Sequence, residues 1–386
     1  MPDSSTPFTP PTPRLRRLSR WLGHVCGVLA VLLLAAWIFG HFVTDRFYLT
    51  QFLWWIPTVI MLPASLVLGL AWRLLAPGGA YAVKTDFTSA AGPRRPTSQT
   101  QKLYLLGCGA VVAYVLIAEW RLGNVLRRPP TSPGVRLVAW NESWAPMKPS
   151  HDNLVALKAD IIFVANPHYT FDAAGVRASM GPTTYSARGG ILTVFSKFPI
   201  LRHGFCPLGI ALEPNRPKYP ILNPDHIDNG EAMWLELDVP ALGGPVIAWC
   251  IDMPSDVWLD RERAFREARN AIDSFRGPVM VRQDSGMDRP EPMSGEVLGF
   301  PAPGIIMGDC NTPRGSYSLS LLHANMHHAF DDAGRGPDYT YPRQWPIIAI
   351  DQILLSPRLV ASHYEILDLG GARHRAQLAV LHAASK

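Results

Sequence analysis

Three long apolar runs occupy the first third of the chain. They cover about residues 22–43, 52–75 and 103–120, and each is nearly free of charge and long enough to span a bilayer. Trp54, Trp55 and Trp120 suit the interfacial positions where aromatic side chains are enriched. This pattern predicts a membrane region over residues 22–120 with three transmembrane helices. Residues 1–21, rich in Pro, Ser and Thr and then in Arg, are expected to form a disordered cytoplasmic tail.

The pattern changes from about residue 135 onward. Apolar runs of strand length alternate with turn clusters there, at residues 135–140, 161–165, 190–195, 233–239, 246–251, 304–307 and 348–355. Helical spacing is found between some of them, at residues 151–158, 259–275 and 316–325. Segments 202–232 and 276–303, rich in Pro and polar residues, are expected to be loops. Mixed strands and helices over this length predict one layered α/β or α+β domain.

The positive charges favour one membrane orientation. The net charge is +5, and many of the basic residues flank the apolar runs rather than forming a nucleic-acid-binding stripe. The N-terminal tail carries Arg14, Arg16, Arg17 and Arg20, and the loop after the second run carries Lys84, Arg94, Arg95 and Lys102, whereas the first loop carries only Arg46. The positive-inside rule then places the C-terminal domain outside the cytoplasm, on an inner membrane of bacterial type. Arg121, Arg127, Arg128 and Arg136, after the third run, weaken this bias.

The stretch Gly-Ile-Ile-Met-Gly-Asp-Cys-Asn-Thr-Pro at residues 304–313 ends an apolar run in polar side chains. On an extended segment, Asp309 and Asn311 project to the same side. A carboxylate that accepts a proton and an amide that donates a hydrogen bond suit phosphate-ester hydrolysis. An Asx-turn that caps the strand is the alternative for this pair. Cys310, between them, is expected to face the other way and to be buried.

Polar residues end other runs as well. Asn141 ends Val-Arg-Leu-Val-Ala-Trp-Asn, and Asn166 ends Ala-Asp-Ile-Ile-Phe-Val-Ala-Asn. Near the C-terminus, Asp351 lies in Ile-Ile-Ala-Ile-Asp-Gln, and His374 lies in Gly-Gly-Ala-Arg-His-Arg. Polar side chains at the ends of several strands are a common way to build a site on a sheet. A site built from these strand-end side chains is therefore predicted.

In this order, the motifs resemble the endonuclease/exonuclease/phosphatase superfamily over about residues 134–383. The segment Gly-Gly-Ile-Leu-Thr-Val-Phe-Ser-Lys-Phe-Pro-Ile at residues 189–200 strengthens the resemblance. It implies an α+β fold, a four-layer α/β/β/α sandwich with its site at one edge of the two sheets. It also implies hydrolysis of phosphodiesters or phosphomonoesters with Mg²⁺ or Mn²⁺.

The resemblance also implies roles for individual residues. Asn141 would help to hold the metal or the phosphate, and Asp309 would orient or deprotonate the attacking water. Asn311 would donate to a phosphoryl oxygen, and His374 would contact the scissile phosphate. Asp351 would accept a hydrogen bond from His374, fix its tautomer and raise its pKa.

Several positions depart from the family pattern. Asn166 stands where the family has the glutamate that is its principal metal ligand, and Asp252 stands where it has a histidine that contacts phosphate. Arg373 replaces an aspartate before the last histidine, and Gln352 replaces a common histidine. Asp252 is then a candidate substitute metal ligand beside Asn141 and Asn166, and Arg373 a candidate phosphate-binding residue.

Two functions remain open at this point. One is a membrane-anchored, metal-dependent hydrolase of phosphate esters, such as those of lipids, nucleotides or nucleic acids. The other is a catalytically inactive member of the fold, acting as a membrane-tethered binding or scaffold module. The position of Asp252 discriminates between them, because a rewired site needs this carboxylate within ligand reach of Asn141 and Asn166. The expected partners are the bilayer and a phosphate-ester substrate, and no protein partner is identifiable from the sequence.

Overall fold

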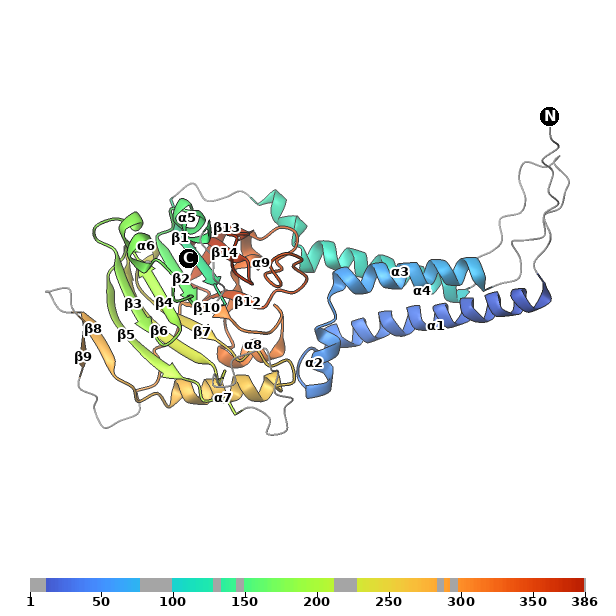
Figure 1. Ribbon diagram of the computed structural model, residues 1–386, viewed down its shortest axis with the longest axis horizontal. Coiled ribbons are helices and arrows are strands. Elements are labelled where there is room, and N and C mark those ends of the chain that lie inside the picture. The colour runs from blue at the N-terminus through green and yellow to red at the C-terminus, as the bar shows by residue number, and fades with distance from the viewer. Residues whose placement is uncertain are drawn as a thin grey trace, which may run out of the picture. The chain divides into compact units, whose positions relative to one another are not determined.

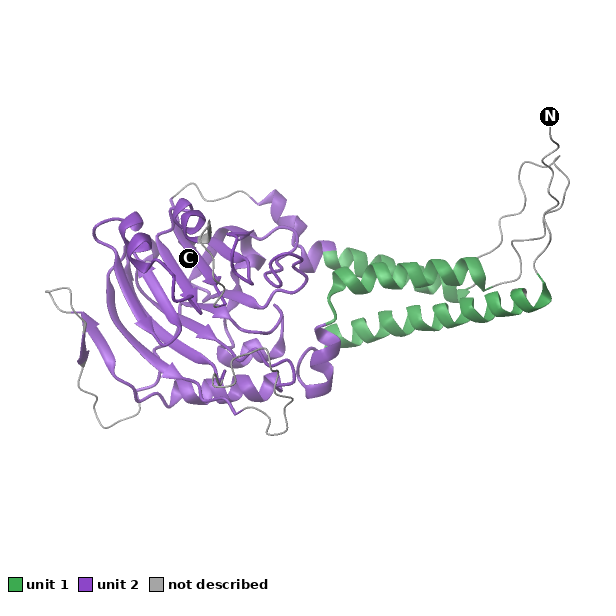
Figure 2. Ribbon diagram, in the orientation of Figure 1, with its two compact units in different colours: residues 1–42, 56–115 green, residues 43–55, 116–386 purple. Residues whose placement is uncertain are grey.

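The structure is a computed structural model that describes residues 12–76, 99–127, 133–143, 149–211, 228–282, 288–291 and 298–384. The chain divides into two compact units, residues 1–42 with 56–115 and residues 43–55 with 116–386 (Figure 2). The first unit contains the apolar helices, and the second contains both sheets.

The first unit is built from α1 (Pro13–Val43), α3 (Thr58–Leu75) and α4 (Gln99–Tyr114). The π-helical turn η1 (Val115–Glu119) follows α4, and all of it except Val115 belongs to the second unit. All three helices, α4 together with η1, are long and apolar enough to cross a membrane. Helix α1 already begins at Pro13, so part of the tail expected to be disordered is helical, while residues 1–11 lie outside the described residues. The second run, predicted over residues 52–75, is split at Pro57. Its first part belongs to the short helix α2 (Tyr48–Trp54), and Pro57 caps α3, where its missing N–H costs nothing.

The second unit contains two mixed sheets (Figure 1). The first has the order β13-β14-β1-β2-β4-β3, and the second has the order β11-β12-β10-β7-β6-β5-β8-β9. Their bounds are β1 (Val135–Asn141), β2 (Ile161–Ala165), β3 (Tyr185–Gly189), β4 (Leu192–Ser196), β5 (Ile200–Pro207), β6 (Glu231–Val239), β7 (Gly244–Asp252), β8 (Val279–Arg282), β9 (Asp288–Glu291), β10 (Ile305–Asp309), β11 (His327–His328), β12 (Asp351–Leu355), β13 (Leu359–Leu367) and β14 (Ala376–Ala383).

Apolar side chains of the two sheets meet in a central core, which includes Phe163 of the first sheet and Leu235 of the second. The outer face of the first sheet is covered by α5 (Pro149–Ala156) and α6 (Ala173–Met180), and Leu154 packs there. The outer face of the second is covered by α7 (Arg261–Asp273) and α8 (Tyr317–Leu322), through side chains such as Phe265. A short helix, α9 (Ala329–Ala333), packs beside β13. This arrangement confirms the predicted α/β/β/α sandwich (Figure 1).

Strand boundaries differ from expectation at two informative places. The run at residues 190–195 contains a tight turn, because Gly190 has φ +52° and β4 begins only at Leu192. The run at residues 348–355 becomes a strand only at Asp351. Segment 202–207, expected to be a loop, belongs to β5, and parts of segment 276–303 form β8 and β9.

Short segments next to the apolar helices belong to the second unit. The Asp45 side chain is 1% exposed and accepts hydrogen bonds from Ser318, by its backbone N–H at 3.2 Å and by its hydroxyl group. Gln51 is fully buried, donates to the Leu259 carbonyl at 3.2 Å and accepts from the Arg261 N–H at 3.2 Å. These buried polar contacts make segment 43–55 part of the folded domain.

Candidate active site

Four acidic residues lie in a row across the second sheet. Glu231 is paired with Asp252 in the β6–β7 ladder, Asp252 with Asp309 in the β7–β10 ladder, and Asp309 with Asp351 in the β10–β12 ladder. Strand β12 runs antiparallel to β10, so its first residue meets the last residue of β10. Partners in one register project to the same face of a sheet, and the row therefore concentrates carboxylates at one edge.

Gly308 permits the close approach of the strands just before this row. Its φ is +141°, and a Cβ added there would lie 1.8 Å from the carbonyl oxygen of Ile251 on β7. A residue with a side chain would push β10 away from β7, because a contact that short is forbidden. The spacing between Asp309 and Asp252 therefore depends on this glycine.

The first sheet contributes two asparagines to the same site. Asn141, at the end of β1, donates to Asp309 Oδ2 at 2.7 Å, so it joins the two sheets. Asn166, one residue beyond β2, has φ +51°, a left-handed conformation that Asn tolerates better than most residues. Its amide nitrogen lies 3.2 Å from Asn141 Oδ1 and 3.1 Å from Asp252 Oδ1. The structure thus brings Asp252, Asn166 and Asn141 together.

His374 lies at the end of the acid row formed by Asp309 and Asp351. Its Nδ1 is 2.9 Å from Asp351 Oδ2 and 3.7 Å from Asp309 Oδ2, and the residue is 6% exposed. Gln377 donates to the Asp351 carbonyl at 2.7 Å and holds this strand end. The ring of Tyr341 packs at 4.9 Å between centroids and covers one side of the imidazole. His374 is therefore held in one orientation, with Nε2 as the ring nitrogen left for a substrate.

The buried charges shift one another's pKa values. Burial, followed by the neighbouring Asp351 carboxylate, raises the pKa of Asp309 to about 7. Burial also raises the pKa of Asp252 well above its usual range, and Asp309 adds to this effect. For His374, burial lowers the pKa, but the carboxylates of Asp351 and Asp309 outweigh it and raise the pKa to about 9. At neutral pH the site holds an imidazolium beside acids that are easily protonated.

Asn311 and Arg373 lie differently from the other predicted residues. The strand ends at Asp309, and Asn311 turns away with φ +47°. Its N–H donates to Asp309 Oδ1 at 2.8 Å, which is the Asx-turn geometry, and its side-chain amide donates to the Met253 carbonyl at 2.7 Å. The amide therefore bridges two site loops instead of projecting beside Asp309. The side chain of Arg373 is exposed next to His374. Cys310 is fully buried, as expected, and packs in the core under α7.

Sequence reasoning missed two residues of the site. Glu231 begins β6, and a hairpin between the predicted strands at residues 233–239 and 246–251 places it opposite Asp252, so the strand pattern contained that signal. Tyr341 comes from the loop before β12, and its ring reaches His374 only through tertiary folding. No local pattern marks such a residue.

The donor set of the site fits a hard divalent cation. Carboxylate and amide oxygens are the ligands that Mg²⁺ and similar ions use. Ligand atoms of Asp309, Asp351 and His374 lie within 4.8 Å of one another, but Nδ1 of His374 is hydrogen-bonded to Asp351, so Asp309 is the member of this group that would serve as a metal ligand. Asp252 adds a second buried carboxylate, whose pKa is raised first by burial and then by the neighbouring Asp309.

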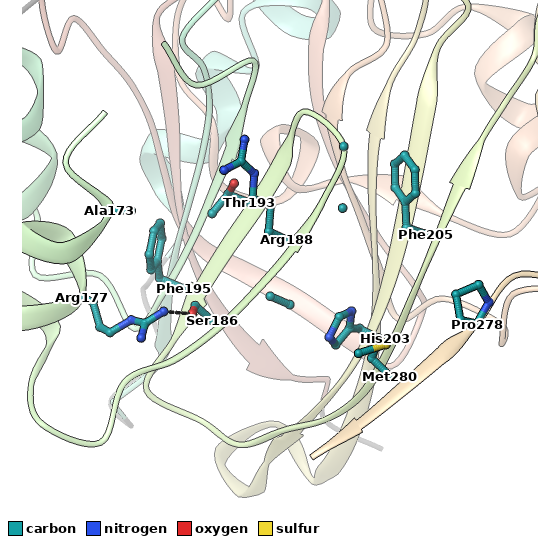
Figure 3. Close-up of a pocket in the computed structure, with 13 residues that line it drawn as sticks. Ala173, Arg177, Ser186, Arg188, Thr193, Phe195, His203, Phe205, Pro278 and Met280 are labelled. Carbon is teal, nitrogen blue, oxygen red and sulfur yellow. Dashed lines mark hydrogen bonds between the residues drawn. The ribbon is translucent and has the colours of Figure 1, made fainter. Parts of the chain in front are cut away.

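A cavity of about 650 Å³ lies apart from these residues, between α6, the edge strand β3 and strands β5 and β8 (Figure 3). Arg177, Arg188, His203 and Phe205 are among its lining residues, and Arg177 donates to the Ser186 hydroxyl. None of the acids in the row lines it. The cavity therefore does not belong to the acid site.

The sequence matches the profile of the Endonuclease/Exonuclease/phosphatase family over residues 147–376. No curated protein sequence matches the chain. Similar solved structures include an endonuclease/exonuclease/phosphatase family protein from Bacteroides thetaiotaomicron, with 12% identity, a TM-score of 0.44 and coverage of 67% of this chain and 100% of that chain. A mannosyl-6-phosphatase from the same species has 12% identity, a TM-score of 0.44 and coverage of 64% and 99%. The human Nocturnin catalytic domain has 13% identity, a TM-score of 0.44 and coverage of 68% and 99%. Because the profile spans more than half of the sequence, the chain belongs to the endonuclease/exonuclease/phosphatase family.

Proposed function

We propose that this protein is a membrane-anchored hydrolase of phosphate esters, with phosphodiesters as substrates and Mg²⁺ or Mn²⁺ as cofactor. Enzymes of the family generally depend on divalent metal ions. The observation that carries the proposal is the contact of Asp252 with Asn166, at 3.1 Å, and of Asn166 with Asn141, at 3.2 Å. A carboxylate on β7 thus stands beside the position where the family has its metal-binding glutamate.

The chain's own residues divide the chemistry between them. Asp309, with its pKa raised to about 7, can accept a proton from the attacking water. His374, with a pKa of about 9, is protonated at neutral pH and is held by Asp351 through Nδ1. Its Nε2–H is then the donor to a phosphoryl or leaving-group oxygen. Arg373, exposed beside it, can attract the substrate's negative charge.

Asp252, Asp309 and Asn141 would hold the metal, with Asn166 beside them. When bound, the metal supplies positive charge that offsets the acid row and polarises the phosphoryl group. The three helices long enough to cross a membrane support anchoring. The distribution of Lys and Arg supports a cytoplasmic N-terminus and an extracytoplasmic domain, on an inner membrane of bacterial type.

Turnover by the purified full chain tests this proposal. The chain in detergent should hydrolyse bis-(p-nitrophenyl) phosphate when Mg²⁺ or Mn²⁺ is added, and EDTA should abolish the activity. Asp309→Asn, which keeps the shape and removes the base, should lower turnover by about 10²-fold or more. The matched control Glu365→Gln alters an exposed carboxylate of β13 and should leave turnover unchanged. No turnover across a screen of metals and esters would refute the proposal.

The alternative function, an inactive binding or scaffold module, predicts a different calorimetric result. For an inactive module, replacing Asp309 or Asp252 should not change the affinity for Mg²⁺ or Mn²⁺. Titration of the metal-free chain, in parallel with Asp252→Asn, separates the two functions. Binding that is lost in the variant supports the hydrolase.

A further inference from the structure

We infer that the substrate is a phosphoester lipid of the same bilayer that holds the apolar helices. This inference deepens the proposed function and rests on it. It is carried by the placement of exposed apolar side chains, by the segments that pack against the site loops, and by the exposed basic residues near them.

The exposed large apolar side chains described for the second unit fall mainly in two places, the site loops and the segments next to the apolar helices. Trp258 and Val257, in the loop after Asp252, are 45% and 46% exposed, and Trp345, in the loop before Asp351, is 82% exposed. Among the described residues of this unit, only Leu201 and Leu298 of this class lie outside the site loops and the segments next to the apolar helices; the others are Phe47, Tyr48, Leu49, Ile117, Leu122, Val125, Leu126, Tyr169 and Tyr341. Exposed aromatic and aliphatic side chains at these two places are suited to contact with the interfacial region of a bilayer.

The segment that follows the first apolar helix packs against the site loops. Within the second unit, Phe52 contacts Trp258 at 5.5 Å between ring centroids. Trp54 donates to the hydroxyl of Ser316, in the loop that begins just after Asp309, at 2.7 Å. Segment 43–55 starts at the last residue of α1. Chain connectivity therefore limits how far these loops can lie from the end of a membrane-spanning helix.

The segment that follows the third apolar helix contacts the same group of loops. Arg314, in the loop after Asp309, donates to the Glu119 carbonyl at 2.6 Å. The Gly336 N–H donates to the Trp120 carbonyl at 2.7 Å, and Arg121 forms a 2.8 Å ion pair with Asp331. Within the second unit, the segments after the first and third apolar helices are therefore both hydrogen-bonded to the loop that follows Asp309.

Exposed arginines lie on the same segments and loops and can attract the phosphate groups of lipids. Arg46 and Arg127 are exposed on the two segments, and Arg373 is exposed beside His374. Arginine at the level of the head groups attracts lipid phosphates, and each such residue adds to the electrostatic binding of an anionic surface. Aromatic rings also stack on nucleobases, but exposed aliphatic side chains such as Val257 and Leu126 suit acyl chains and offer a soluble nucleotide no comparable contact.

The reaction that follows is an ordinary hydrolysis. The oxygen of a water molecule forms a new bond to phosphorus, and the bond from phosphorus to the departing alcohol oxygen breaks. The water proton passes to Asp309, and the alcohol takes up a proton from His374. From a phosphodiester lipid the products are a phosphomonoester and an alcohol, of which one carries the acyl chains, whereas a phosphomonoester lipid gives inorganic phosphate and the acylated alcohol.

The test compares lipids with their own deacylated head groups. The full chain is reconstituted with Mg²⁺ into vesicles of phosphatidylethanolamine, phosphatidylglycerol and phosphatidic acid, and ³¹P NMR follows the phosphoester signals. The same protein in detergent receives the corresponding glycerophosphodiesters and glycerol phosphate. We expect cleavage of at least one lipid, at a rate at least tenfold above that of its deacylated counterpart. Turnover of bis-(p-nitrophenyl) phosphate without lipid cleavage would overturn the inference and leave the proposed function standing, whereas no turnover of any ester would overturn both.

Two variants separate interfacial binding from folding. Trp258→Ser and Trp345→Ser should each lower the ratio of lipid turnover to bis-(p-nitrophenyl) phosphate turnover several-fold. Leu201→Ser and Leu298→Ser remove exposed apolar side chains outside this surface and should leave the ratio unchanged. If all four variants kept the ratio of lipid turnover to bis-(p-nitrophenyl) phosphate turnover of the natural protein, the inference would be overturned.

Discussion

Replacing Asp351 with asparagine tests the charge balance of the site, because Asp351 is the hydrogen-bond acceptor of His374 at 2.9 Å. The pKa of His374 is raised from a usual 6.5 to about 9, so the surroundings favour the imidazolium, by roughly 3 kcal/mol. Burial opposes this shift, and the remaining carboxylate, Asp309, lies farther away, at 3.7 Å. In Asp351→Asn, the pKa of His374 should therefore fall by about one to three units.

NMR titration of histidine side chains in the EDTA-treated protein measures this change. His327 is an internal control, because its pKa is raised by a separate partner, Asp332, and should not move. Stability should change in step. The pKa of His374 is raised on folding, so its contribution is complete below pH 6.5 and is lost as the pH rises through about 9. The free energy of unfolding should decline over that range in the natural protein and less steeply in the variant. An unchanged His374 titration in Asp351→Asn would refute the assigned cause.

Three further predictions concern other parts of the structure. Asn166→Glu should tighten Mg²⁺ binding in calorimetry, because it adds a carboxylate next to Asp252, whereas the uncharged Asn166→Gln should not; equal affinities would contradict the assignment of this position to the metal site. Asp45→Ala should destabilise the second unit by about 3 kcal/mol in thermal unfolding, since Ser318 loses a buried charged acceptor, and a melting temperature equal to that of the natural protein would show that segment 43–55 is not integral. Gly308→Ala should lower the free energy of unfolding by roughly 2 kcal/mol or more beyond the effect of Gly336→Ala, as measured by thermal unfolding. Gly336 is the matched control, because it also has a positive φ but has open space around its Cβ position.

The strands that carry the site could be predicted because they are short, apolar and end in polar residues. Strands β1, β2 and β10 agree closely with the runs at residues 135–140, 161–165 and 304–307. Strands β3 and β14 were not predicted, because their sequences lack the apolar pattern of a strand. Edge strand β3 reads Tyr-Ser-Ala-Arg-Gly, with no apolar period, and β14 is rich in Ala and Leu, which favour helices in isolation. Pairing with β1 and β13 in the middle of the sheet overrides that preference.

The sequence could name the site residues but could not give their contacts. Asp309, Asp351 and His374 come together as the order of motifs suggested, because β12 starts where β10 ends. The turn of Asn311 toward Met253 depends on a left-handed backbone conformation that the residue pattern leaves open. The packing of Tyr341 on His374 depends on a long loop, for which local propensity carries no information.

The backbone contact at Gly308 has a consequence for how the site can vary. Strand spacing there is set by main-chain atoms, so the positions of the strand-end side chains do not depend on which residues occupy them. A carboxylate can then stand at one strand end or at another while the backbone geometry stays constant. With an amide at Asn166 and a carboxylate at Asp252, the negative charge expected on the first sheet stands on the second instead, 3.1 Å away. In this chain, the exchange of single residues between two facing sheets can thus relocate the negative charge of the site without moving the backbone.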